Sequence, residues 1–109
     1  MESIDSVRIL VGTTTFSSKE DAVSAIDQLV RKNLAKCGQV DGPIESHYIW
    51  EGEKQVTLEW RVTLKFSHAN KKKLETELNA NHPYDIQQWV VWEAKAEVKY
   101  GSWVNSGPN

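Results

Sequence analysis

Residues 56–66 read VTLEWRVTLKF and alternate strictly between apolar and polar side chains. Successive side chains of a β-strand point to opposite faces, so this pattern predicts a strand with one packed face and one polar face. At about 3.3 Å per residue the strand would be about 36 Å long, well above the usual five or six residues. A strand of this length extends past the core of so small a domain. We therefore expect part of it to pair with another chain.

The strand belongs to a hairpin, predicted over Ile44–Phe66 with its turn at Trp50-Glu51-Gly52. RNA-recognition domains also contain such a strand, but they stack bases on aromatic residues of a glycine-containing motif. That motif is missing here. Trp60 and Phe66 share a face with aliphatic residues, so we interpret them as core residues and do not expect RNA binding.

Toward the N-terminus, Val7–Val11 continues into a run of threonines and predicts a first strand. A helix should follow, with Ser17 or Ser18 as its N-cap, Glu20 completing a capping box with Ser17, and Gly38 ending it. Its apolar stripe has helical spacing and consists of Ala22, Ala25, Ile26, Leu29, Val30 and Leu34.

Toward the C-terminus, a second helix is predicted from Ser67 to about Ala80, ended by Asn81-His82-Pro83 because a residue before proline disfavours helical geometry. A fourth strand is predicted over Ile86–Trp92. Its segment Trp89–Trp92 is apolar on both faces, and such strands are usually buried on both faces. One layer of helices covers only one face, so a partner subunit is the expected cover for the other.

The order strand, helix, strand, strand, helix, strand predicts an α+β fold of the ferredoxin-like βαββαβ type, with an antiparallel sheet and both helices on one face. The composition is that of an ordinary globular protein, with 39% hydrophobic and 26% charged residues in 109. We expect a single domain over residues 1–109, with its core at about 7–104.

The charge pattern and the single cysteine exclude several classes of protein. A formal net charge of −2 argues against nucleic acid or an anionic membrane as the main partner, and we interpret Lys71-Lys72-Lys73 as a solvated helix face. Cys37 has no partner for an intrachain disulfide, which fits a reducing compartment. Met1–Asp5 lacks the pattern of a signal segment, and no apolar run is long enough to span a membrane. A cytoplasmic protein is expected.

Catalytic signatures are missing from the sequence. It contains no glycine-rich phosphate loop, nucleophile elbow or HExxH motif. His47, His68 and His82 have no histidine or cysteine at metal-site spacing. An enzyme is therefore not expected.

Several short motifs stand out: Ala35-Lys36-Cys37, Tyr48-Ile49-Trp50-Glu51-Gly52, Lys65, His82-Pro83-Tyr84 and Tyr100-x-x-Trp103. Together they resemble the CutA family of divalent-cation-tolerance proteins over about residues 8–104. The resemblance implies a homotrimer in which long hairpins and terminal strands reach across subunits, and a non-catalytic role in binding divalent metal, copper above all.

The resemblance also assigns residues. His82 matches a family metal ligand, and Cys37 is a second candidate, although packing alone would also explain Cys37. Copper(II) favours imidazole nitrogen and copper(I) favours thiolate. Thr14, Asn81 and Gln88 occupy positions where ligand-type residues occur in the family. This departure favours an alternative function: a trimer similar to the PII signalling proteins that binds a small ligand or protein partner in its inter-subunit clefts. The candidate cleft or interface residues are Trp50, Glu51, Lys65, Tyr84, Tyr100 and Trp103.

Overall fold

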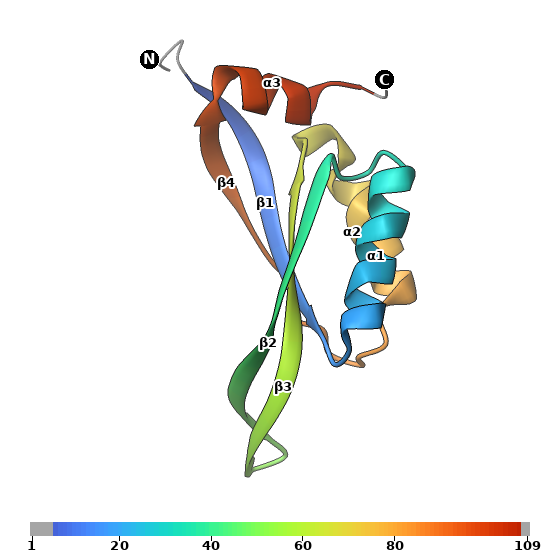
Figure 1. The fold of residues 1–109 in the computed structure, drawn as a ribbon, viewed down its shortest axis with the longest axis vertical. Helices are drawn as coiled ribbons and strands as arrows, with labels where there is room; N and C mark the ends of the chain where they lie inside the picture. Colours follow the sequence, from blue (N-terminus) through green and yellow to red (C-terminus); the bar gives the residue numbers. More distant parts are fainter. Residues whose placement is uncertain (1–5, 108–109) are drawn as a thin grey trace.

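The computed structural model describes residues 6–107, which measure 49 × 29 × 22 Å. Its elements, in chain order, are β1 (Ser6–Phe16), α1 (Lys19–Arg31), β2 (Cys37–Trp50), β3 (Glu53–Phe66), the 3-10 helix η1 (His68–Asn70), α2 (Lys71–Asn81), β4 (Val90–Glu97) and α3 (Val98–Asn105). The four strands form one antiparallel sheet in the order β2-β3-β1-β4 (Figure 1). The predicted ferredoxin-like arrangement is confirmed. The expectations for Met1–Asp5 and for the last two residues of the tail lie outside the described range.

The β2–β3 hairpin is longer than predicted, because β2 begins at Cys37 rather than at Ile44. An irregularity between Asp41 and Ile44 shifts the register of β2 against β3. The β1 pairing of β3 ends at Trp60, so the earlier part of β3 pairs with β2 alone. The end of the hairpin therefore projects as a two-stranded ribbon beyond the helices (Figure 1).

The hairpin turn needs two residues in the left-handed region. Trp50 pairs with Glu53, and the residues between them, Glu51 and Gly52, have φ of 51° and 80°. Positive φ at both central residues is the geometry of a type I′ turn, whose twist matches that of the strands. Glycine adopts it without a steric penalty, whereas Glu51 is held there by the hairpin.

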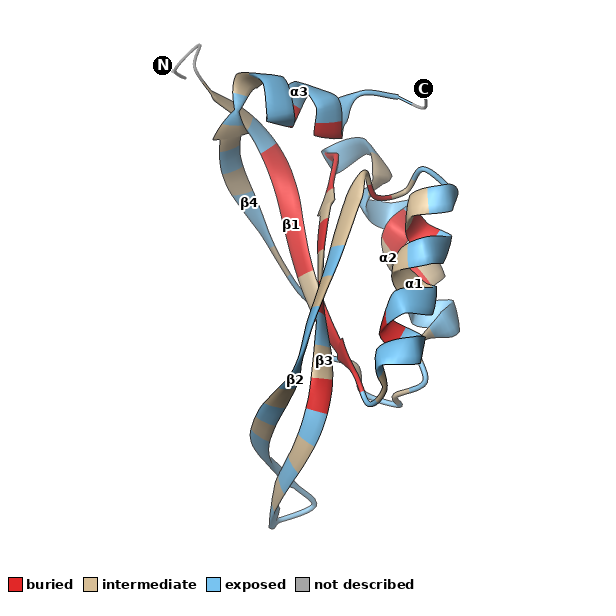
Figure 2. Ribbon diagram, viewed as in Figure 1, coloured by how far each residue is buried: buried red, intermediate tan, exposed pale blue. Residues whose placement is uncertain are grey.

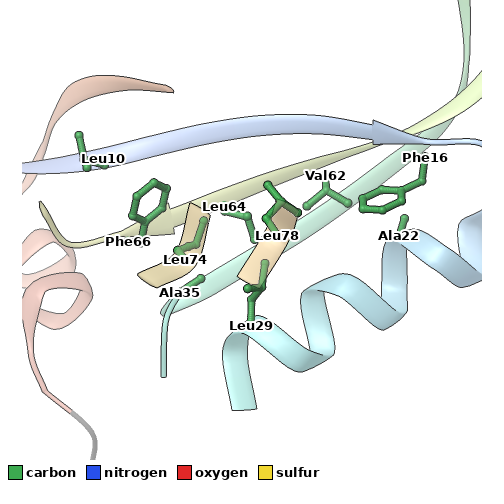
Figure 3. Packing of buried hydrophobic residues seen from close by; sticks show 10 residues of the cluster. All are labelled: Leu10, Phe16, Ala22, Leu29, Ala35, Val62, Leu64, Phe66, Leu74 and Leu78. Carbon is green, nitrogen blue, oxygen red and sulfur yellow. The ribbon is translucent and has the colours of Figure 1, made fainter. Parts of the chain in front are cut away.

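The core lies between the sheet and helices α1 and α2 (Figure 3). The alternating residues of β3 enter it only over its second half, where Val62, Leu64 and Phe66 are fully buried. On the same face of the projecting half, Val56 and Leu58 are 52% and 58% exposed (Figure 2). Together with the three β3 residues, the core cluster consists of Leu10, Phe16, Ala22, Leu29, Ala35, Leu74 and Leu78.

Helix α1 begins after Ser18, one of its two predicted N-caps, and ends earlier than predicted. Ser18 is its N-cap, and the Ser18 hydroxyl accepts a hydrogen bond of 3.1 Å from the Asp21 backbone N–H, so the capping box predicted for Ser17 and Glu20 is wrong. The helix ends at Arg31, well before Gly38. Gly38 instead lies in β2 with no room for a side chain, since a Cβ there would meet the side chain of Ile26. This glycine allows helix and sheet to approach closely.

Strand β4 begins four residues later than predicted and ends five residues later, covering Val90–Glu97 instead of Ile86–Trp92. Trp89 precedes the strand, donates a hydrogen bond of 2.9 Å to Glu75 and lies 6.2 Å from the Phe66 ring. The apolar run 89–92 therefore has two roles: Trp89 packs into the core, and the residues after it begin β4. Val90 and Trp92 are exposed, as expected for the part of a strand face that nothing in the described chain covers.

Helix α3 was not predicted. It begins at Val98, where the Glu97 side chain accepts a hydrogen bond of 3.0 Å from the Tyr100 backbone N–H. Its Val104 packs on Ile9 and Val11, which alternate with Leu10 and so lie on the sheet face away from α1 and α2. A third helix therefore covers one end of the face that was expected to be open.

Candidate functional site

The eight residues predicted as site residues lie in three separate places. His82 and Tyr84 lie together at the C-terminal end of α2. Cys37, Lys65, Tyr100 and Trp103 lie at the end of the sheet that carries α3. Trp50 and Glu51 lie at the projecting tip of the hairpin (Figure 1).

His82 is held by contacts on both ring nitrogens and on its face. Its Nε2 lies 2.9 Å from the Thr15 carbonyl oxygen and 3.1 Å from the Thr14 hydroxyl. Its Nδ1 accepts a hydrogen bond of 3.2 Å from the Tyr84 backbone N–H. The ring stacks on Phe16 with the centroids 4.3 Å apart. Thr14, which the resemblance was expected to place at a ligand-type position, lies beside His82.

These contacts determine the tautomer of His82. A carbonyl oxygen only accepts, so Nε2 carries the proton, and a backbone N–H only donates, so Nδ1 offers its lone pair. Burial lowers the pKa of His82 and favours this neutral form. The bond to Thr15 and the carboxylates of Asp21 and Glu59 act in the opposite direction. Neither ring nitrogen has an unused lone pair for a metal ion, so the arrangement fits a structural histidine better than a ligand.

Tyr84 pairs with a buried carboxylate that the sequence did not single out. Its hydroxyl donates a hydrogen bond of 2.8 Å to Glu59 Oε2, and Glu59 is only 9% exposed. Burial, and then the neighbouring Glu59, raise the pKa of Tyr84, so its hydroxyl stays protonated and donates. Glu59 was placed on the polar face of β3. The sequence contained no signal for its role apart from that position, because Tyr84 meets Glu59 only in the folded chain.

Cys37 lies at the start of β2, half-buried beside Tyr100. Burial, and then the Cys37 side chain, raise the pKa of Tyr100. The Tyr100 and Trp103 rings are 5.8 Å apart, and the Lys36 ammonium lies 5.7 Å from the Trp103 ring. These four side chains form a polar and aromatic cluster, to which α3 contributes both rings.

Cys37 and His82 do not meet within one chain. Cys37 pairs with Lys65, whereas the Phe16 that stacks on His82 pairs with Trp60, so about five residues of strand, or about 16 Å, separate the two places. Among the described residues no three histidine, cysteine, aspartate or glutamate side chains are grouped to hold a metal ion. The two predicted ligands therefore do not fit a metal site formed by a single chain.

The structure contains two histidine–carboxylate pairs that were not predicted from the sequence. His47 Nε2 lies 2.6 Å from Glu45, and His68 Nε2 lies 2.8 Å from Glu93. Both pairs are on the surface. The first could have been found from the i, i+2 spacing on one face of a strand. The second depends on the meeting of η1 and β4.

A pocket of about 170 Å³ lies between α1 and α2, and His82 is one of the residues that line it. Asp21, Gln28 and Glu77 contribute to its polar rim, and Phe16 and Leu29 to its apolar floor. It is a small concavity on the helical side of the molecule, away from the exposed apolar face of the sheet.

This geometry can be compared with known proteins. The model of the CutA1 divalent ion tolerance protein family matches residues 10–107. The chain belongs to this family. A crystal structure of CutA1 from Oryza sativa matches with a TM-score of 0.85 and 28% identity, covering 92% of this chain and 93% of that one.

Two plant relatives extend beyond the matched region. The protein CutA, chloroplastic, of Arabidopsis thaliana is 30% identical over 90 residues, which are 83% of this chain and 50% of that protein. The protein CutA 1, chloroplastic, of Oryza sativa subsp. japonica is 29% identical over 108 residues, which are 97% of this chain and 61% of that protein. The chain thus spans between half and about three-fifths of these relatives. Among the described residues, no helix is long and apolar enough to cross a membrane.

Proposed function

We propose that this member of the divalent ion tolerance family acts as a non-catalytic homotrimer that binds a divalent metal ion, with copper as the first candidate. Exposed apolar side chains support the trimer. Val56 and Leu58 on the hairpin, and Val90 and Trp92 on β4, are about half exposed although they lie in strands of a regular sheet. Exposed apolar patches of this kind mark interaction sites, and long edge strands such as β2 are usually paired or covered.

We further propose that ligands from more than one subunit bind the metal. The observation that carries this proposal is the state of His82, both of whose ring nitrogens are engaged within the chain. The separation of His82 from Cys37 also supports it, because the two predicted ligands of one chain lie too far apart to bind the same ion. A threefold interface repeats every surface ligand three times, so it can assemble a site from residues that are isolated in one subunit.

Calorimetric titration of the metal-stripped protein with copper(II) tests the metal proposal. We expect saturable binding by the trimer, loss of binding in a variant that dissociates into single chains, and less than a twofold change in His82→Ala. Cys37→Ala is titrated in the same way, to compare the second predicted ligand with His82. Absence of saturable binding would contradict the metal proposal. A tenfold loss in His82→Ala would show that His82 leaves its internal bonds to bind the metal.

A second candidate function is binding of a small ligand in the inter-subunit clefts. The Glu59–Tyr84 pair favours it, because a tyrosine hydroxyl bound to a carboxylate is a polar group fixed in position, and binding sites use a few such groups to orient a ligand. Ligand at a hundredfold excess over its dissociation constant should stabilise the trimer by about 2.7 kcal/mol. We expect Glu59→Gln to abolish this stabilisation. A thermal-shift screen in which only metal ions stabilise the protein would contradict this candidate.

We also propose a cytoplasmic location and one folding unit over residues 7–104. Cys37, a lone free thiol, supports the location. Imaging of a tagged full-length protein tests it, and import into an organelle, as the names of the plant relatives suggest for those proteins, would contradict it. Limited proteolysis tests the folding unit, which should resist cleavage as one fragment.

A further inference from the structure

A second pocket lies at the α3 end of the molecule, away from His82. It has a volume of about 330 Å³ and is lined by residues at the end of α1, the start of α2 and the end of α3. These three helix ends lie toward the same end of the molecule (Figure 1). Three lysines line it, Lys32, Lys36 and Lys73, and no aspartate or glutamate does among the residues that the structure describes. The pocket is therefore strongly positive in a protein whose net charge is −2.

Two of these three positive charges have no compensating carboxylate among residues 6–107. Lys73 makes no hydrogen bond or ion pair with any residue between 6 and 107. Lys36 donates a hydrogen bond of 3.0 Å to the Gly107 carbonyl and lies over the Trp103 ring, and both of these partners are neutral. Only Lys32 pairs with an acid, Glu77. An anion in the pocket would supply the missing negative charge.

Ser67 adds a hydroxyl donor to the lining. It is only 9% exposed, it lines the pocket, and its hydroxyl makes no hydrogen bond within residues 6–107. The hydroxyl oxygen keeps contact with solvent, because among the described residues Gln87 Oε1 is the one fully buried side-chain polar atom without a partner. An acceptor atom in the pocket would satisfy this hydroxyl.

The start of α2 is also unusual for a helix without a ligand. Its first residues are Lys71-Lys72-Lys73, its first turn has no acidic residue, and Asn70 provides no side-chain cap. The N-terminal end of a helix carries a partial positive charge, which disfavours cations and favours anions there. Asn70 and Lys73 both line the pocket. The basic run, interpreted from the sequence as a solvated face, thus contributes one of its lysines to a concave site.

We propose that this pocket binds an oxyanion of the phosphate type, either free phosphate or the phosphate group of a small phosphomonoester. A tetrahedral oxyanion has the acceptor oxygens that the Ser67 hydroxyl and the Lys36 and Lys73 ammonium groups require. The site is distinct from any site for a divalent cation, which these lysines would repel. It gives a divalent ion tolerance protein a second ligand of opposite charge.

Calorimetric titration of the full chain with inorganic phosphate, and separately with glycerol 3-phosphate, tests the proposal. Both titrations are run at constant ionic strength with EDTA present, so that failure here is independent of any metal binding. We expect saturable binding of at least one of the two, weakened at least fivefold in Lys73→Gln and in Ser67→Ala. Lys72→Gln is the matched control: it removes the same charge from the same turn at a residue that does not line the pocket, and it should bind within twofold of the unmodified protein.

Several outcomes would overturn the proposal. Equal weakening in Lys73→Gln and Lys72→Gln would mean that the anion only samples the general charge of the helix end. Absence of saturable binding of both probes would mean that the pocket is not an oxyanion site. Tighter binding of inorganic phosphate would support the free ion as ligand, and tighter binding of the ester would support a phosphorylated small molecule. Circular dichroism of each variant confirms that it is folded.

Discussion

The two halves of β3 share one sequence pattern and have opposite surroundings. In the half covered by α1 and α2, Val62, Leu64 and Phe66 are fully buried, whereas in the projecting half Val56 and Leu58 on the same face are more than half exposed. The alternation is equally strict in both. A period-two pattern therefore tells which side chains share a face of a strand, but it does not tell whether anything buries that face.

The covered half should carry the largest stability effect. Phe66→Ala removes a fully buried ring from the core and should cost about 3–5 kcal/mol in the free energy of unfolding, because of the lost transfer energy and the cavity left behind. Urea unfolding measures this. Val56→Ala is the comparison in the projecting half, and at concentrations where the chains are separate it should cost less than about 1 kcal/mol. Comparable costs of the two substitutions in separate chains would contradict the difference between the halves.

The projecting half should instead control assembly. Leu58→Asp places a charge on the exposed apolar face and should dissociate the proposed trimer, because an unpaired charge is costly to bury in an interface. Light scattering after size-exclusion chromatography gives the mass. Val23→Asp is the control, since Val23 is an exposed valine on α1, and it should keep the mass of the unmodified protein. An unchanged mass for Leu58→Asp would place the interface elsewhere.

His82 lies where the helices end and the ribbon begins. Protonation of its ring should lower the free energy of unfolding. Burial lowers its pKa in the folded protein below the value of about 6.5 expected in the unfolded chain. The unfolded chain then binds the proton more readily. The stabilisation is therefore fully present above about pH 6.5 and is lost as the pH falls through the lowered pKa of the folded state. Urea unfolding at pH 7.5 and 5.5 should show a larger loss in the unmodified protein than in His82→Gln. Equal losses would mean that His82 does not titrate in this range.

The smallest effect is expected at the tip of the ribbon. Glu51 has φ of 51° in the two-residue turn, and asparagine followed by glycine is favoured in such turns. Glu51→Asn should raise the free energy of unfolding by less than about 1 kcal/mol. Thermal unfolding of the two proteins at equal concentration measures it. A clear destabilisation would mean that the Glu51 carboxylate contributes contacts that outweigh its backbone conformation.

Much of the fold could be predicted because its signals are local. The helical stripe of Leu29, the alternation ending at Phe66 and the proline after His82 each depend on neighbouring residues only. The prediction was wrong where contacts between residues far apart in the sequence determine the local structure. Trp89 was assigned to a strand because of its apolar neighbours, but its ring fits over Gly12, far away in the sequence. Helix α3 was missed because its partners, such as Ile9, lie at the other end of the chain.

The candidate site shows the same division. The resemblance assigned His82 and Tyr84 to one motif, and the structure places them together. It could not indicate that both nitrogens of His82 are occupied, because Thr15 and the Tyr84 backbone approach them only in the folded chain. Glu59 carried no signal apart from its position on the polar face of β3.

The sequence by itself determined the family, the order of the elements and the faces of the strands, because hydrophobic periodicity and short motifs are properties of contiguous residues. Only the tertiary structure decided which residues are within contact distance of one another. It separated Cys37 from His82, joined Tyr84 to Glu59, and gathered Lys36, Ser67 and Lys73 around one pocket. The physical reason is that a strand keeps residues at fixed spacing along the sheet, while loops and helices bring distant residues onto that frame at positions no local pattern encodes.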